Sequence, residues 1–124
     1  MRPIPRDVFE ELVAEALEGL PDQFLARLEN VGVIVEVEPG PEHLAEQGLG
    51  PDETLFGLYE GVPLTAREDY GNVLPDKITI FQRPLEEYCE TAEEIVEQVR
   101  VTVAHEVAHF FGIDDEALHD MGLG

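Results

Sequence analysis

Residues 91–112 read TAEEIVEQVRVTVAHEVAHFFG and predict one long helix. Thr91 is the expected N-cap, and the side chain of Glu94, three residues later, can reach back to the backbone of the cap and complete a capping box. At about 100° per residue, the apolar side chains gather on one broad face. Its members are Val96, Val99, Val103, Val107, Phe110 and Phe111. We therefore expect this face to pack on the core and the helix to end near Phe111, because Gly112 can adopt the left-handed conformation that ends helices.

The opposite side of the same helix carries the motif HExxH at residues 105–109. Its two imidazoles, His105 and His109, are four residues apart, so they lie on the same side of a helix with about 3.6 residues per turn. This spacing lets them share one metal ion and sets the carboxylate of Glu106 beside it. After Gly112 the chain can turn back and bring Asp115 toward the same ion. The motif then becomes HExxHxxGxxD, which is much more specific than HExxH alone.

The donors of this motif suit a catalytic zinc site, which takes three protein ligands and keeps a fourth position for water. His105 and His109 supply two nitrogen ligands, and Asp115 is the expected third ligand. Asp114 can cap the final helix while Asp115 binds the metal, and Asp114 and His119 remain the alternatives for the third ligand. Zinc is the expected ion, although iron, cobalt, nickel and manganese accept the same donors.

The carboxylate of Glu106 is the expected general base of such a site. A bound Zn²⁺ lowers the pKa of water from about 15.7 to about 7. Glu106 would take the proton as this water attacks a peptide carbonyl and would then pass it to the leaving amine. A second hydrogen-bond donor for the oxyanion is often needed. Tyr59, Tyr70 and His119 are candidates, and the sequence does not choose among them.

The rest of the chain predicts shorter elements around this helix. Further helices are expected at residues 6–19, 22–28 and 115–121, with one helical turn at 42–47. Strands are expected at residues 31–37, 55–62 and 76–82, which are rich in β-branched and aromatic residues. Residues 84–90 connect the third strand to the long helix. A polar loop occupies residues 63–74, and loops of that length in compact domains are often functional.

The composition is strongly acidic, with 7 Lys and Arg against 28 Asp and Glu and a formal net charge of −21. Such a chain repels nucleic acids and anionic membranes, and its charge favours solubility or the attraction of basic peptides. The length of 124 residues suits a single domain spanning residues 1–124. No apolar run approaches a membrane span or a signal peptide, so a cytoplasmic location is expected. Cys89 is the only cysteine, which rules out an internal disulfide.

Three segments of the chain resemble known proteins. The stretch HEVAHFFGIDDE, residues 105–116, resembles the zincin superfamily, and its Asp in place of a third His resembles the metzincin-like branch. Together with LFGLYEGVPL at 55–64 and LPDKITIFQRPLE at 74–86, it resembles a family of short bacterial zincin-like metallopeptidases. The resemblance runs from about residue 31 to the C-terminus.

This resemblance implies an α+β, minimal zincin-like fold. A small mixed sheet of three to four strands would pack against the long active-site helix, with further helices at the N-terminal and C-terminal ends. It also implies that His105, His109 and Asp115 bind the metal and that Glu106 is the general base.

The favoured function is therefore a zinc-dependent peptidase that hydrolyses peptides or unfolded protein segments, acting as a monomer. An extended substrate could pair with a free strand edge, either that of 55–62 or that of 76–82. The alternative is a non-catalytic zincin-like interaction module with a weak or empty metal site and an acidic surface for a basic partner. A metal-dependent ribonuclease is a third reading, but Glu106 and the net charge of −21 both count against it.

Overall fold

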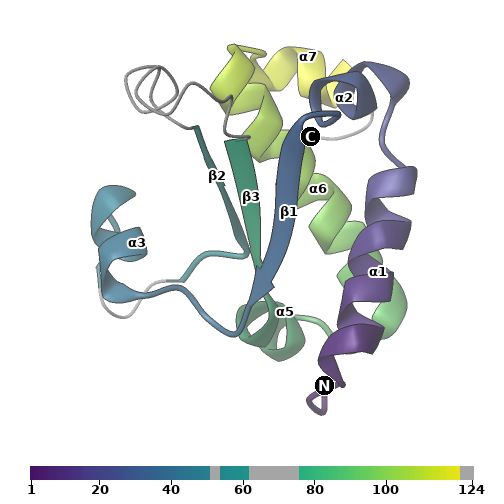
Figure 1. Cartoon of the computed structure of the whole chain (residues 1–124), viewed down its shortest axis with the longest axis vertical. Helices are drawn as coiled ribbons and strands as arrows, with labels where there is room; N and C mark the ends of the chain where they lie inside the picture. Colours follow the sequence, from purple (N-terminus) through teal and green to yellow (C-terminus); the bar gives the residue numbers. More distant parts are fainter. Residues whose placement is uncertain (51–53, 62–75, 121–124) are drawn as a thin grey trace.

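The computed structural model describes residues 1–50, 54–61 and 76–120. Its helices are α1 (Arg6–Glu18), α2 (Asp22–Arg27), α3 (Pro41–Glu46), α5 (Gln82–Tyr88), α6 (Ala92–Phe111) and α7 (Asp115–Asp120). Its strands are β1 (Val31–Glu36), β2 (Gly57–Glu60) and β3 (Asp76–Phe81). The arrangement is a small mixed sheet with helices around it, which confirms the predicted α+β class. Figure 1 shows α1 and α6 side by side on one side of the sheet, with α3 on the other.

The strand order is β1-β3-β2, so β3 lies in the middle of the described sheet. β1 runs parallel to β3, with Val33 opposite Ile78. β2 runs antiparallel to β3, with Tyr59 opposite the same Ile78. The two strands considered for substrate pairing therefore differ in their place in the sheet. Of these two strands, β2 forms an edge of the described sheet and β3 does not.

Alternation along the strands gives the sheet two different faces, as the pleat requires. One face belongs to the main core, which it shares with α6 and α1, and includes Val35, Tyr59, Ile78 and Ile80. The other face carries Leu58, Thr79 and Phe81, which are 3%, 1% and 0% exposed. On that side the ring of His43 in α3 lies 5.6 Å from the ring of Phe81. The short helix α3 therefore helps to cover the second face.

The long helix α6 is the main support of the sheet. It packs against β2 and α1, and its buried residues are Ile95, Val99, Val103, Ala104, Val107 and Ala108. The prediction that Phe110 and Phe111 are buried was wrong, since they are 49% and 40% exposed. A helical wheel assumes that the helix is covered along its whole length. Instead, the last turn of α6 passes the end of β2, where the ring of Phe110 meets that of Tyr59 at 4.2 Å and keeps its other side exposed.

Both ends of α6 are set by the expected residues. Thr91 Oγ1 accepts a hydrogen bond from Glu94 N at 3.1 Å. The side chain of Glu94 accepts from the backbone of Glu90 at 3.0 Å, one residue before the N-cap rather than at the cap itself. At the other end Gly112 has φ 75° and ψ 23°, and Ile113 N donates to Ala108 O at 2.8 Å. This left-handed turn ends the helix, as predicted.

One part of the chain differs from the sequence prediction, and two others lie outside the described residues. Residues 84–90, expected to be a connection, lie largely within α5, which begins at Gln82. Pro84 fits there because it lies in the first turn, where backbone N–H groups have no partner within the helix. The predicted loop at 63–74 lies outside the described residues, as does Met121 at the predicted end of the last helix. None of the described helices is long and apolar enough to cross a membrane.

Cys89 follows α5 and is a free, buried thiol that is 1% exposed. Burial raises its pKa above the ordinary value, and the negative charge of Glu94 raises it further. The thiol therefore stays protonated at neutral pH and is a poor nucleophile.

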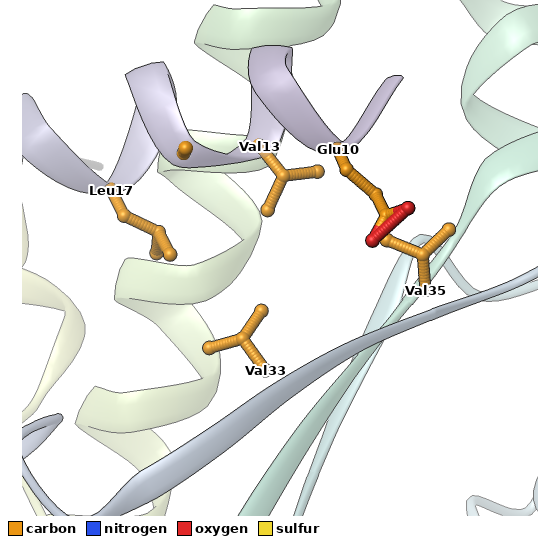
Figure 2. Close-up of a pocket in the computed structure, with 6 residues that line it drawn as sticks. Glu10, Val13, Leu17, Val33 and Val35 are labelled. Atoms are coloured by element: carbon orange, nitrogen blue, oxygen red, sulfur yellow. The ribbon is translucent and has the colours of Figure 1, made fainter. Parts of the chain in front are cut away.

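A groove of about 190 Å³ lies between α1 and β1, which is the edge strand opposite β2 in the described sheet. Figure 2 shows Val13 and Leu17 of α1 facing Val33 and Val35 of β1, with Glu10 at one end. The groove is apolar apart from this one carboxylate, and none of the motif residues lines it.

Candidate metal centre and active site

Helix α6 places both motif histidines on one side in its last two turns. The ring centroids of His105 and His109 are 6.2 Å apart, and their planes are nearly perpendicular at 86°. His105 is half-buried, whereas His109 is exposed and lines a cleft. Two imidazoles on one tetrahedral zinc, with Zn–N bonds of about 2.0–2.1 Å, have centroids roughly 5 Å apart.

Glu106 lies beside the two histidines and reaches the sheet. Its Oε1 accepts a hydrogen bond from the backbone N–H of Tyr59 in β2 at 3.0 Å. The carboxylate is half-buried and lies at the edge of β2 rather than in open solvent. The motif is therefore fixed to the sheet through a backbone donor, which no sequence pattern could have indicated.

Tyr59 contacts both the motif helix and the sheet at this point of the molecule. Its backbone N–H binds Glu106, its ring stacks at 4.2 Å on Phe110, and its hydroxyl donates to Asp76 Oδ2 at 2.7 Å. Of the three oxyanion-donor candidates, Tyr59 thus lies against the motif with its hydroxyl engaged by Asp76. Tyr70 lies outside the described residues, and His119 is exposed on α7.

The turn after α6 separates the roles of two neighbouring aspartates. Asp114 Oδ1 accepts a hydrogen bond from Ala117 N at 2.8 Å, which makes Asp114 the N-cap of α7. Asp115 is the first residue of that helix, and its side chain lies outside the described part of the structure. Asp115 as third ligand therefore stays a prediction. Among the described side chains, no group of three or more His, Cys, Asp or Glu is arranged to hold a metal ion.

A cleft of about 230 Å³ opens beside the motif. It is lined by Gln47, Leu58, Tyr59, Glu106, His109 and Phe110. Gln47, which follows α3, is a lining residue that sequence reasoning missed, since it is far along the chain from the motif. The cleft is smaller than the roughly 300–1,000 Å³ typical of small-molecule pockets. Its size suits one side chain of an extended chain better than an enclosed small molecule.

Two exposed aromatic rings lie at the end of α6, and that of Phe110 lines this cleft. Phe110 lies against the chain just after β2, since a Cβ on Gly61 would be only 2.9 Å from its ring. The guanidinium of Arg27 lies over the ring of Phe111, 4.7 Å from its centroid, in a cation–π contact. These contacts hold the last turn of α6 in place although its aromatic side chains are exposed.

Comparison with known proteins identifies the family. A family model described as zincin-like metallopeptidase matches residues 28–124, which includes the sheet, the motif helix and α7. The chain belongs to the zincin-like metallopeptidase family. This confirms the resemblance drawn from the three sequence segments, and it places the protein at family level among metallopeptidases, for which zinc is the implied cofactor.

The fold of this zincin-like protein is similar to one solved structure in particular. A conserved hypothetical protein from Thermus thermophilus superposes with a TM-score of 0.57 at 23% sequence identity. The match covers 87% of this chain and 94% of the other. At this identity the likeness shows the fold alone. No curated protein matches the chain significantly.

Proposed function

We propose that this zincin-like protein is a zinc-dependent peptidase in which Glu106 is the general base. The observation that carries the proposal is the position of the Glu106 carboxylate. It lies between two histidines of one helix face and the edge of a strand, 3.0 Å from the N–H of Tyr59. A general base must be within reach of both the water it activates and the peptide that the water attacks. Glu106 meets both conditions, because it lies next to the proposed metal ligands and next to a strand edge where a peptide could bind.

His105, His109 and Asp115 are the proposed metal ligands. Two imidazoles and a carboxylate are donors that zinc accepts, and they leave a fourth position for water. Because Asp114 is engaged as the cap of α7, it is the weaker candidate for third ligand. When bound, zinc would acidify a water molecule and polarise the peptide carbonyl.

Proton transfer and substrate binding are assigned to different residues of the chain. Glu106 accepts the proton of the attacking water on its carboxylate and donates it to the nitrogen of the leaving amine. In the substrate-free protein the carboxylate is held by the backbone N–H of Tyr59, whose ring and hydroxyl are both engaged. The apolar cleft residues Leu58 and Phe110 accept a substrate side chain next to the reacting bond.

An extended peptide is the proposed substrate, paired with the edge of β2. Phe81 N donates to Phe56 O at 2.9 Å, so residue 56 directs its carbonyl toward β3. In an antiparallel ladder the next residues alternate, and those at 57 and 59 direct their backbone groups away from β3. The bond from Tyr59 N–H to Glu106 agrees with this alternation. A peptide strand added here would lie across the motif.

The deciding experiment is a calorimetric titration of metal-free protein with Zn²⁺. We expect one site of micromolar affinity or tighter in the wild type, and its loss in His109→Ala and Asp115→Ala. Asp114→Ser is the matched control, because serine keeps the helix cap but lacks the carboxylate, so this variant should bind zinc normally. His119→Ala should do the same.

A zinc-loaded wild type should then hydrolyse unfolded or peptide substrates, and Glu106→Gln should not. If the wild type binds no metal specifically, the peptidase proposal fails. A non-catalytic interaction module with an acidic surface would then be the better description.

A further inference from the structure

The edge of β2 has a backbone donor that is already occupied. Tyr59 N–H points away from β3 and donates to Glu106 Oε1 at 3.0 Å. An added peptide strand would pair with this same N–H through one of its own carbonyl groups. Glu106 and a peptide carbonyl therefore compete for one donor.

The strand side of this contact cannot easily move. Tyr59 is 9% exposed, its ring stacks on Phe110, and its hydroxyl donates to Asp76. The strand also lies close to the motif helix, since a Cβ on Gly57 would be 3.0 Å from Thr102 Cγ2 in α6. Thr102 precedes Glu106 by four residues, about one helical turn. The strand and the helix are thus held at a fixed spacing.

The Glu106 side chain is the part that can move. It is half-buried, it borders the cleft, and its carboxylate can rotate about the side-chain bonds while the helix stays in place. If Glu106 left Tyr59 N–H with no other acceptor in its place, a shielded backbone donor would be unpaired, which is unfavourable. A peptide carbonyl that takes over the same N–H removes that cost. Exchange of one acceptor for another is therefore the favourable route by which Glu106 leaves the strand.

We propose that an extended peptide displaces Glu106 from Tyr59 N–H as it pairs with β2, and that this exchange frees the carboxylate to act as general base. The carboxylate is held on the strand in the substrate-free protein and is released by the substrate itself. The role of the released carboxylate rests on the proposed function. The exchange of partners is a binding event and is independent of it.

The favoured peptide is extended, neutral or basic, with an apolar side chain. Leu58 and Phe110 provide the apolar part of the cleft wall. The net charge of −21 attracts a basic peptide rather than an acidic one. A seven-residue probe with a central Phe, lysines near its ends and a fluorescent label meets these requirements.

The test measures binding of this probe to metal-free protein, so that no hydrolysis is involved. Glu106→Ala removes the competing acceptor and should bind the probe about three- to tenfold more tightly than the wild type, the gain expected from one hydrogen bond that need not be broken. Glu106→Gln is the matched control. It removes the same charge but keeps an oxygen acceptor for Tyr59 N–H, so it should bind at least twofold more weakly than Glu106→Ala.

A second measurement follows the Tyr59 amide by hydrogen exchange. In the free wild type the amide should be protected, in free Glu106→Ala it should exchange faster, and the bound probe should protect it again. Renewed protection by the probe would show that the N–H in the folded variant has a new acceptor.

Three results would overturn the exchange. One is equal affinity of Glu106→Ala and the wild type, and another is equal tightening in Glu106→Ala and Glu106→Gln, which would show that competition for the Tyr59 N–H is not the cause. The third is absence of probe binding in all three proteins. Failure of zinc binding or hydrolysis would refute the proposed function and leave these affinities unchanged, so the two failures are distinguishable.

Discussion

The two edges of the described sheet each hold a charged side chain, and the charges are opposite. At the β1 edge the guanidinium of Arg6 donates to the carbonyl of Val35, beside the apolar groove between α1 and β1. At the β2 edge the carboxylate of Glu106 accepts from the N–H of Tyr59. Charged side chains are a common means of blocking strand edges. Such a contact gains a chemical role only from its neighbours: Glu106 has two imidazoles beside it, whereas Arg6 has the carboxylate of Glu10 at 3.9 Å.

The largest expected effect is a difference in activity between variants at the two edges. Glu106→Gln should lower kcat/KM for peptide hydrolysis by about 10²–10⁴-fold, since general-base catalysis contributes that much. Arg6→Gln, the equivalent change at the β1 edge, should leave kcat/KM unchanged. Both are measured with zinc-loaded protein and one fluorogenic peptide. Equal loss in the two variants would mean that the edges matter only for folding.

The next effect tests whether the C-terminal helix α7 supports the proposed metal site. Leu118 of α7 is 0% exposed, and Leu118→Ala should destabilise the protein by about 2–5 kcal/mol through the cavity it leaves. Because α7 begins at the proposed ligand Asp115, zinc affinity should fall as well. Denaturant unfolding and calorimetry measure the two quantities.

Val13→Ala in the β1 groove is the control for that prediction. Val13 is 4% exposed and lies far from the motif along the chain, so its truncation should also destabilise the fold. Its zinc affinity should match that of the wild type. If both variants lose zinc affinity in proportion to their stability, α7 has no special connection to the metal site.

A smaller effect separates the side chain of Tyr59 from its backbone. Tyr59→Phe removes the hydrogen bond to Asp76 but keeps the ring on Phe110 and the N–H on Glu106. We expect a loss of about 1 kcal/mol in stability and little change in kcat/KM, as measured by urea unfolding and steady-state kinetics. A loss of activity comparable with that of Glu106→Gln would instead make the hydroxyl part of the catalytic machinery.

The smallest effect concerns a surface ion pair that does not contact a strand edge. It shows how little such a charge contributes to stability. The hydrogen bonds of Arg100 lower the pKa of Glu97, although this carboxylate is largely exposed. A lowered folded-state pKa adds stability above the unfolded pKa, and that stability is lost as the pH falls through the folded pKa. Glu97→Gln should therefore cost below about 0.5 kcal/mol at neutral pH, and the difference should vanish in acid. Thermal unfolding at both pH values checks this, and an equal difference at low pH would contradict it.

Local signals made most of the helices and strands predictable, although α5 was expected to be a connection. The long helix was bounded correctly because Thr91 and Gly112 act through their own neighbours in the chain, and the alternation in the strands needed no knowledge of the fold. The burial of Phe110 was mispredicted, since it depends on where β2 ends relative to α6. The contact from Tyr59 to Glu106 could not be predicted, because every residue except proline has a backbone N–H and the sequence does not show which one meets Glu106. For the same reason Gln47, distant along the chain, was missed as part of the cleft.

The cap on α7 has a further consequence for the molecule. By accepting from Ala117 N, Asp114 fixes which residue begins the helix, and thereby fixes the direction of every side chain after it. A start one residue earlier or later would turn the helix face by about 100°. Leu118, now fully buried, would then leave the core. The hydrogen bond from Ala117 N to Asp114 thus determines which residues of α7 face the core.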